Sequence, residues 1–250
     1  MILFILYTAL ANFSYYRTLK SLELILSYYI IMAFKLFEYL QFVFLAVFLG
    51  LFLGVAIYIK RKDNLNAISL KFGRDGVRNL IEILSFVFTN LWIFAILLYL
   101  ISPDVRSYMT VLDINLLNIL PVKIIGLILI ITGFIFYIMA LVYLGNSWRL
   151  GIDIIHPGKL VTGGIYAFSR NPIYVFFIFY YTGTFFLNPN FIFLIFTVII
   201  ALILHFQILQ EENFLMGIFK KDYEAYLREV PRYFNFRTLN MGNMRNKRIF

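Results

Sequence analysis

Three groups of polar residues interrupt an otherwise apolar sequence, and each contains side chains that could bind a charged ligand. The groups are Trp148-Arg149, the segment Lys159–Tyr174, and a third set made of Gln207, Gln210, Glu211 and Glu212. Polar residues next to long apolar runs indicate a functional site, because an unpaired polar group in lipid costs free energy. Carboxylates and aromatic rings of this kind stabilise cations.

The third group is of interest because of its helical spacing. In a helix through residues 205–212, Gln207, Gln210 and Glu211 fall on one face, whereas Glu212 lies about 100° further around. The two carboxylates then point in different directions, so that one could hold a ligand while the other handles a proton. The spacing alone favours a simpler interpretation, in which both glutamates are surface residues where a helix leaves the bilayer.

The second group combines a flexible backbone with the start of a helix. Gly163-Gly164 permits backbone conformations that other residues resist. Pro172 suits the first position of a helix, and the backbone N–H groups in the first turn of a helix are free to bind a ligand. This pattern could form a ligand cradle. It is also compatible with a plain loop in which Arg170 reaches the membrane interface and Tyr166 and Tyr174 are interfacial aromatics.

The remaining polar residues favour structural interpretations and exclude several chemistries. Trp148-Arg149 follows an apolar run, which is typical of an interfacial anchor. His205 lies within an apolar run and is expected to be a hydrogen-bonded core residue, whereas His156 lies in a loop. Two histidines are too few for a metal centre. The absence of cysteine rules out disulfides and thiolate chemistry.

The elements that position these groups are apolar helices. The chain has 250 residues, of which 62% are hydrophobic and 14% charged, a composition that indicates an integral membrane protein. A helix needs roughly 20 residues to cross the hydrocarbon core. Five apolar runs are predicted to be transmembrane helices: Tyr39–Ile59, Ile83–Ile101, Ile124–Leu144, Ile173–Leu187 and Phe191–Leu209.

The predicted fold is all-α, with about five core transmembrane helices. Asn188-Pro189-Asn190 separates the last two runs and predicts a helical hairpin. Unbroken apolar runs exclude the alternating pattern of a β-barrel. We divide the chain into a hydrophobic N-terminal segment of unassigned topology (1–38), transmembrane helices (39–145), a site-bearing region with the hairpin (146–234) and a basic tail (235–250).

The distribution of basic residues predicts the orientation of the chain. The connection Lys60–Arg78 holds six Lys and Arg residues, whereas Ser102–Val122 has only Arg106. Basic residues are retained on the cytoplasmic side. Alternation therefore places Gly145–Asn171 and the tail from Gln210 in the cytoplasm. Together with Lys60–Arg78, these segments account for the net charge of +9, which leaves no reason to expect nucleic acid and favours contact with anionic membrane lipid.

Motifs in the second half of the chain resemble a known family when taken together. They are Leu160–Tyr166 (LVTGGIY), Arg170–Tyr174 (RNPIY), Glu211-Glu212, Tyr223–Tyr226 (YEAY) and Val230-Pro231-Arg232. Their order and spacing are similar to those of the integral-membrane isoprenylcysteine carboxyl methyltransferases and their prokaryotic and phospholipid-methylating relatives. The resemblance covers roughly Leu144 to Phe234, and it implies a prokaryotic-type member whose cofactor site lies at the end of the hairpin.

The resemblance implies that S-adenosylmethionine is the cofactor and that a lipid or prenylated substrate arrives through the membrane. The residues implied to contact the cofactor are Lys159, Leu160, Val161, Tyr166, Asn171, Pro172, Ile173, Tyr174 and Glu211. The chemistry agrees, because the cofactor carries a sulfonium and an α-amino group that carboxylates and aromatic faces stabilise. Methyl transfer itself depends mainly on alignment and on exclusion of water.

Two residues depart from the family's pattern. Asn171 replaces a histidine, and Gln207 replaces the arginine that holds the substrate carboxylate, a role for which Arg149 or Arg170 could substitute. Gln207 and Trp148 are the candidate substrate contacts. An amine acceptor would need a base, for which Glu212 is the candidate, whereas a carboxylate acceptor needs none.

Two other functions remain open from the sequence. One is a membrane reductase of the sterol-reductase type that uses NADPH, because that class has a related Arg-His-Pro-Asn-Tyr motif. Ile173 and the Glu211-Glu212 pair argue against it. The other is a non-enzymatic membrane scaffold, which the substitutions at Asn171 and Gln207 would permit.

Overall fold

The computed structural model describes residues 2–63, 76–145 and 159–233. Its contacts divide the chain into two compact units, Met1–Val43 and Phe44–Phe250. Helix α1 spans Ile2–Asp63. The first unit is therefore helical, in a region for which the sequence assigned no topology. Leucine and alanine, together with the absence of proline, favour this helix over residues 2–43.

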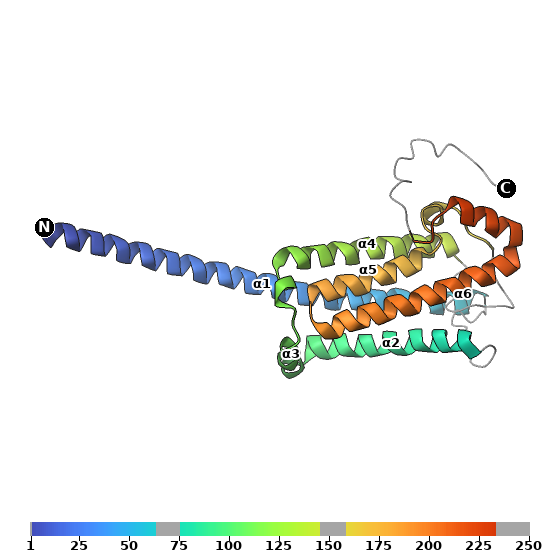
Figure 1. The fold of residues 1–250 in the computed structure, drawn as a ribbon, viewed down its shortest axis with the longest axis horizontal. Helices are drawn as coiled ribbons and strands as arrows, with labels where there is room; N and C mark the ends of the chain where they lie inside the picture. Colours follow the sequence, from blue (N-terminus) through green and yellow to red (C-terminus); the bar gives the residue numbers. More distant parts are fainter. Residues whose placement is uncertain (1, 64–75, 146–158, 234–250) are drawn as a thin grey trace. The chain divides into compact units, whose positions relative to one another are not determined.

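The second unit is a bundle of apolar helices. It continues with α2 (Gly76–Ile101), α3 (Pro103–Thr110), the 3-10 turn η1 (Asn115–Leu117), α4 (Leu120–Leu144), the 3-10 turn η3 (Gly164–Ala167), α5 (Pro172–Leu187) and α6 (Phe191–Glu229). Helices α2, α4, α5 and α6 lie side by side in Figure 1. No strand occurs in the described ranges, which confirms the all-α fold.

The helix positions confirm four of the five predicted spans and refine their ends, and the fifth, Ile173–Leu187, lies on a shorter apolar helix. Four stretches are long and apolar enough to cross a membrane: Lys35–Val55, Leu80–Ile101, Leu120–Leu144 and part of Phe191–Glu229; the shorter apolar helix is α5. Asn190 caps α6 by accepting a hydrogen bond from the backbone N–H of Phe193 at 3.0 Å, as a helical hairpin requires. Helix α3 was not predicted, although Ser102 caps it and Pro103 begins it.

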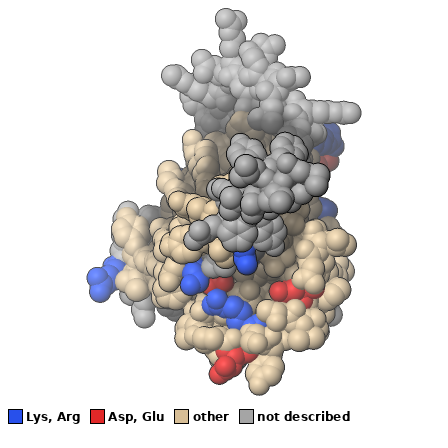
Figure 2. All heavy atoms as spheres, turned by 90° about the vertical axis from the view of Figure 1, so that its left-hand side faces the viewer, with Lys and Arg blue, Asp and Glu red and all other residues tan. Residues whose placement is uncertain are grey.

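Apolar residues cover the outside of the bundle as well as its interior. Phe94 is 61% exposed, Val142 73% and Leu202 56%. On the face drawn in Figure 2, charged side chains form a few scattered spots among uncharged residues. So many exposed apolar side chains on helices of spanning length indicate a surface solvated by lipid. The chain is a multi-pass integral membrane protein.

Aromatic residues fill the interior of the second unit. The ring centroid of Phe48, from α1, lies 5.6 Å from that of Phe176 and 5.8 Å from that of Tyr180, both from α5. Trp92 of α2 lies 5.5 Å from Tyr180. These four side chains are buried, and tilted or edge-on rings at such distances attract one another. The core therefore holds α5 in the centre of the unit.

Two glycines allow α4 and α5 to approach closely. A Cβ on Gly126 would lie 2.7 Å from the carbonyl oxygen of Gly183, and a Cβ on Gly183 would lie 2.6 Å from that of Gly126. Small residues permit this kind of backbone contact between membrane helices. The last turns of α5, next to the hairpin turn, are thereby held against the start of α4.

Replacement of Gly126 by alanine is expected to lower stability by about 1–3 kcal/mol, because the added methyl group meets backbone that cannot yield easily. The midpoint of thermal unfolding in detergent measures the effect. Gly217→Ala in α6 is the matched control, since a Cβ there meets nothing within 4 Å. Equal midpoints for the two variants would contradict the close contact of α4 with α5.

Candidate functional site

A tight turn positions the start of α5. Gly164 has a φ of 61°, a left-handed conformation that favours glycine, and a Cβ at this position would collide with the ring of Tyr143. The turn is followed by η3 and then by Pro172 at the first position of α5. The glycine pair and the proline thus have the roles that their residue types predict, and they bring Arg170–Tyr174 to the end of the bundle where α4 ends.

Tyr174 and Glu211 join α5 to α6 at this end of the bundle. The hydroxyl of Tyr174 donates a hydrogen bond of 2.8 Å to Oε2 of Glu211. Among the described residues Glu211 forms no ion pair with a basic side chain. Glu82 of α2 is buried, and its charge acts on both Tyr174 and Glu211. Two acidic side chains, from α2 and α6, therefore lie near one another here, which favours a cationic ligand.

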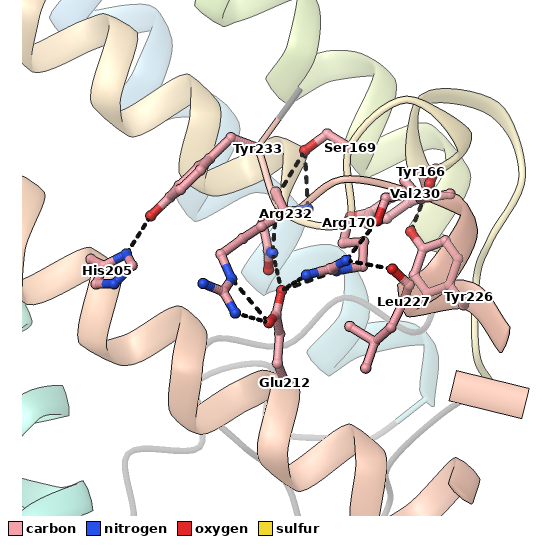
Figure 3. Close-up of polar contacts among 11 residues, drawn as sticks. Tyr166, Ser169, Arg170, His205, Glu212, Tyr226, Leu227, Val230, Arg232 and Tyr233 are labelled. Atoms are coloured by element: carbon pink, nitrogen blue, oxygen red, sulfur yellow. Dashed lines mark hydrogen bonds and ion pairs between the residues drawn. The ribbon is translucent and has the colours of Figure 1, made fainter. Parts of the chain in front are cut away.

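Glu212 lies at the centre of a second set of contacts, the Glu212 cluster, made of Arg170, Asn171, Glu212 and Arg232 (Figure 3). Its Oε1 accepts hydrogen bonds from Nε and Nη2 of Arg170 at 3.1 and 3.0 Å and from Nδ2 of Asn171 at 3.0 Å. Its Oε2 accepts from Nε and Nη2 of Arg232 at 3.0 and 2.9 Å. Such forked, charge-assisted bonds are strong and directional.

The burial of Glu212 corrects the simpler interpretation of the sequence. Only 6% of this residue is exposed, so it is not a surface residue at the membrane boundary. A buried carboxylate needs partners, and the two guanidinium groups supply them. Both of its oxygens already accept hydrogen bonds from arginine. Glu212 is therefore suited to hold other side chains in place.

Arg170 is fully engaged within the protein. Its Nη1 donates to the carbonyl oxygens of Leu227 and Val230 at 3.1 and 2.6 Å, while Nε and Nη2 bond Glu212. Its side chain is only 8% exposed. Arg170 therefore links the start of α5 to the end of α6 and has no nitrogen left without a protein partner.

The last described residues fold back over the site because α6 changes direction. Lys220 has a φ of 47°, and the helix after it returns toward η3 and the start of α5 in Figure 1. The hydroxyl of Tyr226 donates to the carbonyl oxygen of Tyr166 at 2.6 Å, and Tyr223 and Tyr226 are both buried. The second part of α6 is thereby fastened to the glycine turn.

Segment 230–233 is bonded to both sides of the site. The backbone N–H of Arg170 donates to the carbonyl oxygen of Pro231 at 3.1 Å, and Nδ2 of Asn171 donates to that of Arg232 at 3.1 Å. A hydrogen bond of 2.7 Å joins the hydroxyl of Tyr233 to Nδ1 of His205. His205 is thus a hydrogen-bonded residue, as expected from the sequence.

The surroundings fix the protonation of two groups outside the membrane-spanning segments. Burial, followed by the charge of Glu211, raises the pKa of Tyr166 above its ordinary value, so its phenol stays neutral. The hydrogen bonds to Glu212 raise the pKa of Arg232, which keeps its positive charge. The site therefore contains a neutral phenol at Tyr166 and a positively charged guanidinium at Arg232.

The structure brings together most of the residues singled out from the sequence. Val161 and Ile173 pack against a cluster that contains Tyr166, and Leu160 packs against Tyr223 and Tyr226. Lys159 is exposed, and Pro172 is buried at the start of α5. Trp148, Arg149 and His156 lie outside the described residues.

Gln207 lies one turn before Glu211 on α6. Its Oε1 is buried and has no hydrogen-bond partner among the described residues. A buried amide oxygen without a partner is costly, which suggests that a donor group pairs with it when a ligand is bound.

Two residues of the site received no role from the sequence. Arg232 belongs to the Val-Pro-Arg motif, but nothing in the motif reveals a contact with Glu212 across 20 residues. Glu82 is an isolated acidic residue directly before a predicted span. An acidic side chain at the end of a membrane helix is the feature that could have indicated a functional role. No group of His, Asp and Glu able to hold a metal occurs in the described part of the chain.

The region that carries the site is similar in sequence to known methyltransferases. Residues 122–222 match the family model described as phospholipid methyltransferase. A 73-residue stretch is 40% identical to protein-S-isoprenylcysteine O-methyltransferase of Schizosaccharomyces pombe. The match covers 29% of this chain and 31% of that relative, so the chain spans less than a third of the length of the curated relative.

Proposed function

We propose that this chain, whose residues 122–222 match the family model of phospholipid methyltransferases, is an integral-membrane methyltransferase that uses S-adenosylmethionine. The observation that carries the proposal is Glu211, a carboxylate bonded to Tyr174 but to no basic side chain among the described residues. Bound S-adenosylmethionine would supply a methyl group on a sulfonium cation. The carboxylate of Glu211 suits such a ligand.

The residues around Glu211 fit the rest of the cofactor. Helix α5 begins with the N–H groups of Ile173 and Tyr174, which have no partner in the described part of the chain. Free N–H groups of this kind can bind polar ligand atoms. We assign cofactor contacts to Lys159, Leu160, Val161, Tyr166 and the segment Asn171–Tyr174, together with Glu211.

We assign Arg170 and Glu212 a positioning role. Their bonds hold Asn171 at the start of α5 and tie the fold-back of α6 to it. A base must have an oxygen directed at the acceptor, whereas both oxygens of Glu212 face guanidinium groups. Alignment of the methyl group with its acceptor therefore depends on the Glu212 cluster, which does not itself transfer a proton.

The acceptor is a lipid or a prenylated small molecule that arrives through the membrane, and the site faces the cytoplasm. A carboxylate acceptor needs no base, whereas an ammonium acceptor must first lose a proton to solvent, because both oxygens of Glu212 are already occupied. The buried Oε1 of Gln207 favours an acceptor that can donate an N–H to it. In this proposal residues 146–234 form the cofactor region, and residues 235–250 form a basic tail that contacts anionic lipid.

The experiment uses the full chain in lipid vesicles with S-adenosylmethionine labelled in its methyl group. We expect label to pass into a lipid-soluble acceptor, either a phospholipid amine or a farnesylated cysteine, and Glu211→Gln to remove this transfer. Glu224→Gln, on the exposed surface of the same helix, is the control. Consumption of NADPH without label transfer would favour the reductase, and no reaction with either cofactor would favour the scaffold.

A further inference from the structure

Arg232 carries a guanidinium nitrogen that the protein does not use. Its Nε and Nη2 bond Glu212, whereas its Nη1 has no hydrogen-bond partner among the described residues. In Figure 3 the third nitrogen of this guanidinium points away from the carboxylate. The side chain is 34% exposed, compared with 8% for Arg170. Of the two arginines bound to Glu212, only Arg232 is therefore accessible to a ligand.

The position of this guanidinium is fixed before any ligand binds. The backbone of Arg232 is held because its carbonyl oxygen accepts from Asn171, while Pro231 is bonded to Arg170 and Tyr233 to His205. The forked bond to Glu212 fixes the rotation of the side chain. Binding to a preorganised group costs less conformational entropy than binding to a free surface arginine.

The charges of the cluster favour an anion at this point. Arg170 and Arg232 together carry two positive charges, and Glu212 supplies one negative charge between them. One positive charge is thus left over, and it lies on the exposed side of the cluster. A planar guanidinium with a free N–H suits a carboxylate.

We propose that Arg232 binds a carboxylate of a ligand in this site, with Glu212 acting as the residue that orients it. The inference rests on the proposed function. Arg232 is then the group that binds the anion. Gln207 carries no charge to do so, and Arg170 has no free nitrogen. The carboxylate belongs either to the amino-acid part of S-adenosylmethionine or to the acceptor. The cofactor fits well, because its α-amino group and α-carboxylate would meet Glu211 and Arg232.

The experiment measures binding of S-adenosylmethionine and of its decarboxylated analogue to the full chain in detergent. Arg232→Gln is expected to weaken binding of S-adenosylmethionine about 10- to 100-fold and to leave binding of the decarboxylated analogue within about twofold of wild type. Arg232→Lys keeps the ion pair with Glu212 but loses the fork, and it should show most of the same loss. Retained binding of the analogue shows that the variants are folded.

Arg228→Gln is the matched control, since Arg228 is 76% exposed and pairs with Glu224 on the helix surface.

A second arm compares a farnesylated cysteine that has a free carboxylate with its carboxamide as competitors of labelled acceptor. If Arg232→Gln weakens only the free carboxylate, the acceptor is the source. If neither carboxylate is affected while wild type binds S-adenosylmethionine, the proposal for Arg232 is wrong. If wild type does not bind S-adenosylmethionine at all, the proposed function fails instead.

Discussion

Replacement of Glu212 by alanine is expected to lower the free energy of unfolding by about 3–5 kcal/mol, the largest stability effect at this site. The substitution leaves the guanidinium of Arg170, with 8% of its side chain exposed, next to Arg232 without a counter-charge. It also removes the acceptor for Nδ2 of Asn171. Denaturant or thermal unfolding of the detergent-solubilised chain measures the loss.

The control for Glu212 is another glutamate that bonds an arginine. Glu224 pairs with Arg228 four residues later on the surface of α6, and both side chains are exposed. Glu224→Ala should change stability by less than about 0.5 kcal/mol, because exposed pairs of this spacing contribute little. A Glu212→Ala variant as stable as Glu224→Ala would show that the buried cluster does not hold the fold-back in place.

Replacement of Glu211 by glutamine is expected to weaken binding of S-adenosylmethionine about 10- to 100-fold, the largest effect on affinity. Glutamine has nearly the same shape and can still accept the hydrogen bond from Tyr174, so the change removes charge and little else. Stability should be unchanged or higher, because a carboxylate without a cationic partner is costly to bury. Affinity is measured by titration and stability by the unfolding midpoint.

Tyr174→Phe separates the charge of Glu211 from its orientation. It removes the donor to Glu211 but leaves the carboxylate, so we expect a loss of affinity smaller than that of Glu211→Gln. If Tyr174→Phe were the more damaging of the two, the hydrogen bond and not the charge would dominate cofactor binding.

The sequence predicted the spans because long apolar runs are a local signal. The start of α4 was predicted at Ile124 and lies at Leu120, and the hairpin turn lies where Asn188-Pro189-Asn190 predicted it. The left-handed Gly164 and the proline at the start of α5 were also predictable, since each residue type is favoured in its conformation. The sequence does not predict helix α3, because its eight residues, PDVRSYMT, are few and contain no apolar run.

The surroundings of Glu212 could not be predicted from the sequence. They depend on the turn of the chain at Lys220, where a residue other than glycine has a positive φ and no local pattern signals it. This turn brings Arg232 back to Glu212 from 20 residues away. Helical spacing described the direction of the two carboxylates, but only the tertiary fold determines which one is buried between arginines.

Calorimetric titration of the wild-type chain in detergent tests the central claim most directly. The ligands are S-adenosylmethionine, its demethylated product S-adenosylhomocysteine, and NADPH. Saturable binding of the first two, with no heat from NADPH, is the predicted result, because the charges of Glu211 and Arg232 suit the amino-acid group that those two ligands share. Saturable binding of NADPH alone would contradict the assignment of the site to methyl transfer and would point to a reductase.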